Sequence, residues 1–257
     1  MTTRSTIPLG TPCWADLWTS DTEGSRRFYR GVFGWEALDP DPEFGGYFNF
    51  ARHGAWTAGA MGSMGDMKAN DTWKPYLASD DADATAKRIE AAGGQVRGGP
   101  MPVGDLGIQL VATDPTGASF GVWQPRSFSG FAVIGEDGAP SWFELHTADH
   151  AAAVSFYREV FELEVTPVAD TDEFRYFTFR SAGTEEDTGG IMDSRAWVPE
   201  GAAAWSIYWE VADMDATTAR VGELGGSILQ GPEVTPYGTL TEAADPAGAR
   251  FKLRTSP

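Results

Sequence analysis

Short stretches in which apolar and polar residues alternate are each followed by a segment with helical periodicity. Residues 13–20, CWADLWTS, alternate as a half-buried strand does. Ser20 or Asp21 can then cap a helix that ends at Gly34. The apolar side of that helix carries Phe28, Tyr29, Val32 and Phe33. Short apolar runs around 35–38, 46–51 and 56–61 predict three further strands.

The same order of elements recurs directly afterwards. The pattern predicts a strand over 75–79 and then a helix over 82–92, capped by Asp80 or Asp81 and stopped by Gly93 and Gly94. Three more strands are expected near 95–98, 107–113 and 118–123. The tetrapeptide DPTG at 114–117 makes the last hairpin turn. Each unit is therefore strand, helix, strand, strand, strand.

The second half of the chain repeats the first. PCWADLWTSD (12–21) matches PSWFELHTAD (140–149), and FYRGVFGW (28–35) matches FYREVFEL (156–163), both at an offset of 128 residues. The halves close with DPTGASF (114–120) and DPAGARF (245–251). Such ordered matches indicate a duplication and four modules in total. We expect a first domain over 1–128, a linker over 129–139 and a second domain over 140–257.

These motifs, in this order, resemble the vicinal oxygen chelate (VOC) superfamily, which includes glyoxalase I, extradiol dioxygenases, and fosfomycin- and bleomycin-resistance proteins. The resemblance covers nearly all 257 residues. In detail the chain looks like the tandem-domain actinobacterial members that are often catalogued as hydroxylases or glyoxalase-like proteins. The resemblance implies an α+β fold of four βαβββ modules in two tandem domains. Helices that all return to one face of a sheet would leave the other face free to curl around a cavity.

The resemblance also implies where metal ligands would stand, because metal-dependent members take them from the opening and closing strands of the modules. The corresponding positions are Trp14, Lys74, Gly121 and Gly59 or Ala60 in the first half, and Trp142, Ser206, Lys252 and Gly190 or Ile191 in the second. An indole offers only an N–H donor, and a protonated lysine has no lone pair. We therefore expect that both halves lack the usual metal centre, and we expect no cofactor.

Polar side chains that could do chemistry gather in the second half. Glu144 and His146 lie two and four residues beyond Trp142, so they share the side of the strand that faces the cavity in the superfamily. Tyr208 and Glu210 are expected on the same concave face. Three interpretations of His146 stay open: a hydrogen-bonded structural residue, ligand recognition or acid–base work, and metal ligation.

The first-half counterparts of this cluster are aromatic and acidic. Trp14, Asp16 and Trp18 are expected on the cavity side, where an indole can stack on a planar or cationic ligand. A cavity that the tryptophans simply fill is the alternative. Trp73, Trp205 and Trp209 are expected in the core. His150, in the first turn of a helix, is expected in solvent, and His53 in a hairpin turn.

Charge and composition limit the kinds of partner. With 19 basic and 37 acidic residues the net charge is −18, which argues against nucleic acid and anionic membranes as partners. The N-terminal stretch lacks the apolar core of a signal peptide, and Cys13 is the only cysteine. The sequence therefore predicts a cytoplasmic protein.

Two functions from different classes fit these features. One is a metal-independent protein that binds a small, aromatic or cationic molecule in aromatic and acidic cavities. The alternative is a lyase-, hydroxylase- or dioxygenase-like enzyme that acts on a small carbonyl or aromatic compound, with Glu144 and His146 as acid and base. The chain is expected to be a monomer or a homodimer.

Overall fold

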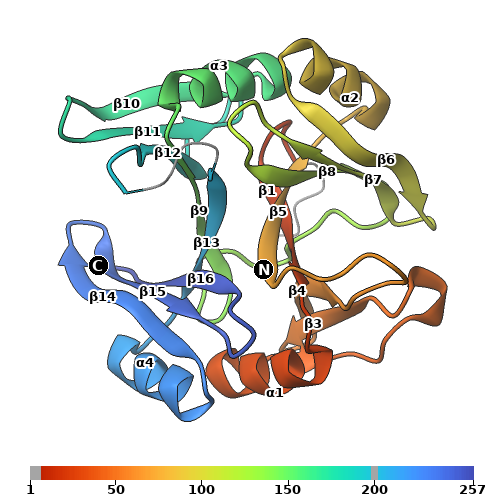
Figure 1. Cartoon of the computed structure of the whole chain (residues 1–257), viewed down its shortest axis with the longest axis vertical. Coiled ribbons are helices and arrows are strands. Elements are labelled where there is room, and N and C mark those ends of the chain that lie inside the picture. The colour runs from red at the N-terminus through yellow and green to blue at the C-terminus, as the bar shows by residue number, and fades with distance from the viewer. Residues whose placement is uncertain (1–6, 198–201) are drawn as a thin grey trace.

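The computed structural model describes residues 7–197 and 202–257, and within these ranges the chain forms two eight-stranded sheets (Figure 1). The strand orders are β2-β3-β4-β1-β5-β8-β7-β6 and β10-β11-β12-β9-β13-β16-β15-β14. The strands of the first sheet are β1 (Pro12–Trp18), β2 (Glu36–Ala37), β3 (Phe48–Arg52), β4 (Ala55–Met61), β5 (Thr72–Ala78), β6 (Gln95–Val103), β7 (Gly107–Thr113) and β8 (Ser119–Pro125). Those of the second are β9 (Pro140–Thr147), β10 (Glu164–Asp170), β11 (Arg175–Arg180), β12 (Gly189–Asp193), β13 (Ala204–Glu210), β14 (Ser227–Thr235), β15 (Gly238–Ala244) and β16 (Arg250–Thr255).

Four α-helices within the described residues complete the modules. They are α1 (Thr22–Phe33), α2 (Ala82–Ala91), α3 (His150–Phe161) and α4 (Met214–Glu223), and a short 3₁₀ turn, η1 (Pro42–Phe44), precedes β3. The order strand, helix, strand, strand, strand therefore occurs four times, which confirms the predicted fold class. The modules pair within each half, because β1 lies antiparallel to β5 and β9 lies antiparallel to β13.

The helix boundaries follow the predicted capping chemistry. The carboxylate of Asp21, not Ser20, accepts the N–H of Gly24, and Gly34 ends the helix in the left-handed region at φ 70°. Asp81, not Asp80, caps α2 through the N–H of Ala84. Glycine suits the position at Gly34 because it has no Cβ to clash at positive φ.

The two sheets stand back to back in the centre of the molecule, with α2 and α3 at one end and α1 and α4 at the other (Figure 1). Helix α1 packs its aromatic side chains against the opposite half, where Phe33 lies 6.0 Å from Trp209 and 5.9 Å from Phe251, centroid to centroid. Trp73, Trp205 and Trp209 are buried, as predicted. The concave faces of the sheets therefore point away from each other.

A hydrogen-bonded relay is repeated at the two ends of this central core. Trp73 donates through Nε1 to the hydroxyl of Tyr29 at 2.9 Å, and Tyr29 donates to Asp245 at 3.1 Å. In the same way Trp205 donates to Tyr157 at 3.0 Å, and Tyr157 donates to Asp114 at 3.0 Å. Each aspartate belongs to the Asp-Pro-x-Gly turn of the other half. The two halves are thus joined by matching buried polar contacts as well as by apolar packing.

The segment between the sheets is itself packed. Phe131 is buried between Trp14 and Phe143, with centroid distances of 5.4 and 5.9 Å. The indole of Trp35 donates to the carbonyl oxygen of Gly138 at 2.8 Å. The predicted linker therefore contacts both halves, and the proposed domain boundaries stay a prediction.

None of the helices within residues 7–197 and 202–257 is long and apolar enough to cross a bilayer.

Candidate functional site

The central strands of each sheet place matching residues in two rows on the concave face. In the second half, Glu144 on β9 pairs with Gly190 on β12 and with Ser206 on β13. In the next row, Tyr208 pairs with Trp142 and with Lys252 on β16. Because side chains alternate along a strand, these six residues face the same side of the sheet.

The carboxylate of Glu144 is the centre of a hydrogen-bonded network. Its Oε1 lies 2.7 Å from Nε2 of His146, accepts the hydroxyl of Tyr208 at 2.8 Å, and accepts the ammonium of Lys252 at 3.1 Å. Lys252 Nζ also lies 3.0 Å from the Tyr208 hydroxyl and 3.0 Å from His146 Nε2. The predicted trio Glu144, His146 and Tyr208 is therefore brought together, with Lys252 as its fourth member.

This environment fixes the charge of Glu144. Burial by itself would raise its pKa, but the Lys252 ammonium and the hydrogen bond from His146 outweigh burial and hold the pKa well below the usual range. Glu144 is therefore an anion at neutral pH and a weak proton acceptor. His146 Nε2 lies between a carboxylate that needs a donor and an ammonium that donates, so only one of its two contacts is a hydrogen bond in either neutral tautomer.

An aromatic wall lies beside the network. The Nε1–H of the partly buried Trp142 donates to the hydroxyl of Tyr176 on β11 at 2.9 Å. Gly190 makes room for this hydroxyl, because a Cβ at position 190 would overlap it. On the other side, Lys252 and Tyr208 line a small hollow of about 110 Å³ that also includes Glu233 and Glu242.

The first half has the same rows with the lysine moved. Asp16 on β1 pairs with Gly59 on β4 and with Lys74 on β5. Trp14 pairs with Tyr76, and Tyr76 pairs with Gly121 on β8. Lysine therefore stands in the carboxylate row in the first half, where the second half has Ser206. In the second half it stands in the neighbouring row, where the first half has Gly121.

The move of the lysine changes the electrostatics of the first cavity. Asp16 Oδ1 accepts the hydroxyl of Tyr47 at 2.8 Å and the indole N–H of Trp14 at 3.0 Å. Burial raises the pKa of Asp16, and hydrogen bonds from Tyr76 and Tyr47 offset only part of that rise. Burial likewise lowers the pKa of Lys74, with Asp16 acting in the opposite direction. The carboxylate of the second half is held ionised, whereas burial favours the neutral form of the carboxyl in the first half.

Three predicted ligand-binding residues have other contacts. Trp14 is only 5% exposed and packs edge-on against Phe128 at 4.9 Å, so a ligand could stack on its ring only if Phe128 moved. Its role in ligand binding stays a prediction. Trp18 is partly exposed and donates through Nε1 to the carbonyl oxygen of Gly62 at 3.0 Å. The buried Glu210 accepts the backbone N–H of Ser256 at 2.6 Å and makes no hydrogen bond to the Glu144 network within the described residues.

His150 does not lie in solvent as the sequence suggested. It is 4% exposed, contacts Phe177 edge-on at 4.6 Å, and its Nε2 lies 3.2 Å from the carbonyl oxygen of Ile191. Burial lowers its pKa. The prediction for His53 is confirmed, since it lies in an exposed turn at φ 51°.

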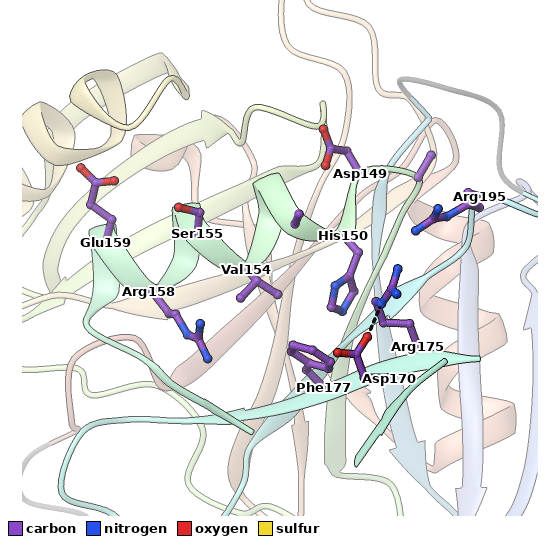
Figure 2. Close-up of a pocket in the computed structure, with 12 residues that line it drawn as sticks. Asp149, His150, Val154, Ser155, Arg158, Glu159, Asp170, Arg175, Phe177 and Arg195 are labelled. Carbon is purple, nitrogen blue, oxygen red and sulfur yellow. Dashed lines mark hydrogen bonds and ion pairs between the residues drawn. The ribbon is translucent and has the colours of Figure 1, made fainter. Parts of the chain in front are cut away.

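Figure 2 shows the hollow of about 830 Å³ that His150 and Phe177 line on the helix side of the second sheet, between α3 and β11. Its lining includes the arginines Arg158, Arg175 and Arg195 and the carboxylates Asp149, Glu159 and Asp170, and Arg175 pairs with Asp170 at 2.6 Å. The charges balance, so this surface selects neither anions nor cations. The polar networks of the concave faces are the better candidate sites.

The predicted ligand positions do not suit a metal ion. In the second half, a cation bound to both Glu144 and His146 would have to displace the Lys252 ammonium, which lies 3.1 and 3.0 Å from them. Among the described residues no group of three or more His, Cys, Asp or Glu side chains could hold a metal ion. The donor set fits hydrogen bonding to an organic molecule. The absence of a metal centre in solution stays a prediction.

The comparisons with known proteins agree with the repeated architecture. The sequence model of the Glyoxalase/Bleomycin resistance protein/Dioxygenase superfamily matches residues 13–122 and again residues 140–253. The Anthracycline biosynthesis protein DauV of Streptomyces sp. (strain C5) is 35% identical over 275 residues, which cover 95% of this chain and 92% of DauV.

Solved structures of low sequence identity share the fold. The Mn(II)-bound glyoxalase from Novosphingobium aromaticivorans superposes with a TM-score of 0.65 at 18% identity, covering 96% of this chain and 82% of that one. The 2,3-dioxygenase LapB from Pseudomonas sp. KL28 gives a TM-score of 0.66 at 15% identity, covering 97% of this chain and 94% of LapB.

Proposed function

The chain belongs to the glyoxalase/bleomycin resistance protein/dioxygenase superfamily, as its sequence pattern predicted, and from this premise we propose that it binds a small planar organic molecule without a metal. The ligand would lie on the concave face of the second half, with its oxygen-bearing edge on Lys252 and Tyr208. The observation that carries the proposal is the Glu144 network, which fixes an ammonium and a hydroxyl at the wall of a hollow.

The chemistry of the hollow indicates what the ligand carries. The Tyr208 hydroxyl already donates its proton to Glu144. When His146 Nε2 carries a proton and donates to Glu144, the third N–H of Lys252 is free for a carbonyl or phenolic oxygen, and Glu233 and Glu242 can accept from a hydroxyl or an amine. At about 110 Å³ the hollow is smaller than the roughly 300 Å³ of an ordinary ligand pocket, so it suits one edge of a larger molecule. The partly buried Trp142 and Tyr176 offer aromatic surface for the rest.

The kind of molecule is proposed from a relative. DauV is named for anthracycline biosynthesis, and anthracyclines contain a planar, oxygenated ring system. A hydroxyanthraquinone therefore combines the flat surface and the oxygen acceptors that this cavity would recognise. Quinizarin, a dihydroxyanthraquinone, is a suitable probe.

Titration calorimetry with quinizarin tests the proposal. We expect Lys252→Met to weaken binding by about tenfold or more, because it removes a charge-assisted hydrogen bond worth about 1.5–3 kcal/mol. Lys68→Met, in an exposed loop, is the matched control and should bind as the unmodified protein does. Chelation with EDTA should leave the affinity unchanged. Equal affinity in Lys252→Met, or loss of binding after chelation, would contradict the proposal.

A second candidate function is an enzyme that transfers a proton on a small carbonyl or aromatic compound. The position of His146 Nε2, 2.7 Å from Glu144 and 3.0 Å from Lys252, favours it, because such a nitrogen can release or take a proton beside a fixed anion. Glu144, held ionised, would orient His146. This function requires turnover that disappears in His146→Ala while quinizarin still binds.

A further inference from the structure

Lys74 lies on the face of the first sheet opposite the aromatic core. It alternates with Trp73 and Pro75, which are buried, and it is in register with Asp16 across the β1–β5 ladder. Lys74, Asp16, Trp18 and Tyr47 are all partly exposed, whereas Trp14 and Tyr76 in the neighbouring row are buried. Lys74 therefore belongs to the accessible part of this face.

The side-chain amine of Lys74 has no hydrogen bond or ion pair to any residue within 7–197 and 202–257. Lys252 differs in this respect, because its ammonium has Glu144 Oε1 at 3.1 Å and the Tyr208 hydroxyl at 3.0 Å. Asp16, the carboxyl nearest to Lys74 in the ladder, is already bonded to Tyr47 and Trp14. The amine of Lys74 is thus left free for a ligand.

Burial shifts both Lys74 and Asp16 toward their uncharged forms, which suits nucleophilic chemistry. It lowers the pKa of the Lys74 ammonium and raises the pKa of the Asp16 carboxyl. A larger share of uncharged amine makes Lys74 a better nucleophile, and a larger share of protonated carboxyl lets Asp16 act as a general acid.

We propose that Lys74 condenses with an aldehyde or ketone that reaches the partly exposed group of Lys74, Asp16 and Tyr47 and forms an imine, with Asp16 protonating the departing oxygen. This is a separate activity from ligand binding in the second half. It assigns a reactive-carbonyl substrate class to the first half, which the Glu144 network does not reach.

The step balances without any further reagent. The lone pair of Lys74 Nζ attacks the carbonyl carbon, a C–N bond forms, and the carbonyl oxygen takes the proton that the nitrogen loses. The C–O bond of this carbinolamine then breaks as Asp16 gives its proton to the hydroxyl, which leaves as water. The nitrogen lone pair forms the C=N bond, and the remaining N–H proton returns to Asp16.

Trapping with a reductant tests the proposal, and the chain suits it because it has only four lysines, Lys68, Lys74, Lys87 and Lys252. The protein is incubated with salicylaldehyde and cyanoborohydride at pH 7, and the labelled peptides are quantified by mass spectrometry. Lys68 and Lys87 are exposed and serve as internal references. We expect labelling at Lys74 to be about tenfold faster than at either reference, because burial lowers the pKa of its ammonium and so enlarges the share of uncharged amine.

Two variants separate the mechanism from simple accessibility. Asp16→Asn should slow labelling at Lys74 by about tenfold or more and leave Lys68 and Lys87 unchanged, because only Lys74 loses its acid. Lys252→Met should leave labelling at Lys74 unchanged, which separates this activity from binding in the second half. Labelling of Lys74 no faster than that of Lys68 and Lys87 would overturn the proposal, and so would full reactivity in Asp16→Asn.

Discussion

The hydroxyl of Tyr29 donates a 3.1 Å hydrogen bond to the carboxylate of Asp245, which lies 216 residues further along the chain. Tyr157 makes the equivalent bond to Asp114. Both aspartates are about 4% exposed, and burial raises the pKa of each. The two contacts are matching buried polar links between the halves, beside others such as the 2.6 Å contact between the hydroxyls of Thr11 and Ser181. Their removal tests how the halves depend on each other.

We predict that Tyr29→Phe and Tyr157→Phe each lower the free energy of unfolding by about 1–3 kcal/mol, because each leaves the Oδ2 atom of a buried aspartate and an indole N–H without a partner. Urea titrations followed by tryptophan fluorescence measure this loss, and both halves should unfold in one transition. Tyr237→Phe, at a side chain that is 60% exposed, is the control. A loss below about 0.5 kcal/mol in both variants would show that the relay contributes little.

The two cavity carboxylates should respond oppositely to amide substitution at pH 7. Glu144→Gln leaves the Lys252 ammonium without its anion and should cost about 3 kcal/mol of unfolding free energy. Asp16→Asn keeps an acceptor for Tyr47 and Trp14 and removes a charge that burial disfavours. It should change stability by less than about 0.5 kcal/mol or increase it. Urea titrations of the two variants measure these changes in the free energy of unfolding. Equal losses of stability in both variants would refute the electrostatic difference between the halves.

The same contrast predicts the dependence of stability on pH. The pKa of Glu144 is lower in the folded than in the unfolded chain, so its contribution is present above its ordinary value of 4.5 and is lost as pH falls below it. The pKa of Asp16 is raised on folding, so its unfavourable contribution is present at neutral pH and disappears as pH falls through the raised value. Glu144→Gln should therefore flatten the acid loss of stability between pH 6 and 3, and Asp16→Asn should steepen it. Urea midpoints measured across this range would contradict the assignment if the two profiles were alike.

Glycine on the closing strand of the first module of each half gives room to a tyrosine hydroxyl. A Cβ at Gly59 would overlap the hydroxyl of Tyr47, and one at Gly190 would overlap that of Tyr176. Gly59→Ala and Gly190→Ala should each lower the free energy of unfolding by about 1–3 kcal/mol through overpacking. Gly98→Ala is the matched control, because nothing lies within 4 Å of a Cβ at that edge-strand position. If all three variants lose the same stability, strand propensity and not crowding is the cause.

The overall architecture could be predicted from the sequence because its determinants are local. The caps at Asp21 and Asp81, the left-handed Gly34 and the repeated Asp-Pro-x-Gly turns act within a few residues. Duplication then supplied the order of elements twice over. The prediction was less accurate for the edge strands: β2 has only two residues, Glu36–Ala37, whereas β6 extends over Gln95–Val103.

The sequence predicted only part of the site. The position of Lys252 depends on the register between strands that lie far apart in the sequence. Glu144, His146 and Tyr208 follow from alternation along two strands, but Lys252 joins Glu144 from 108 residues away. Comparison of the two halves shows that a lysine, Lys252, replaces Gly121 at this position. Only the pairing of β13 with β16 shows that its ammonium reaches the carboxylate of Glu144. The sequence did not indicate that Phe128, from the segment after β8, packs against the ring of Trp14. His150 was misassigned because Phe177 of β11 packs against it.

Tyr29 and Tyr157, each of which donates to an aspartate of the other half, limit how the sequence of the chain can diverge. Each half donates a buried tyrosine hydroxyl to an aspartate of the other half, so loss of either half would expose buried polar and apolar groups of the one that remains. The hydrogen-bonded networks of the concave faces, in contrast, each use residues of one half. The lysine accordingly stands in different rows of the two halves: Lys74 is in the carboxylate row, and Lys252 is in the neighbouring row. Substitutions in the contacts between the halves are therefore costly, whereas substitutions on each concave face can change its chemistry separately.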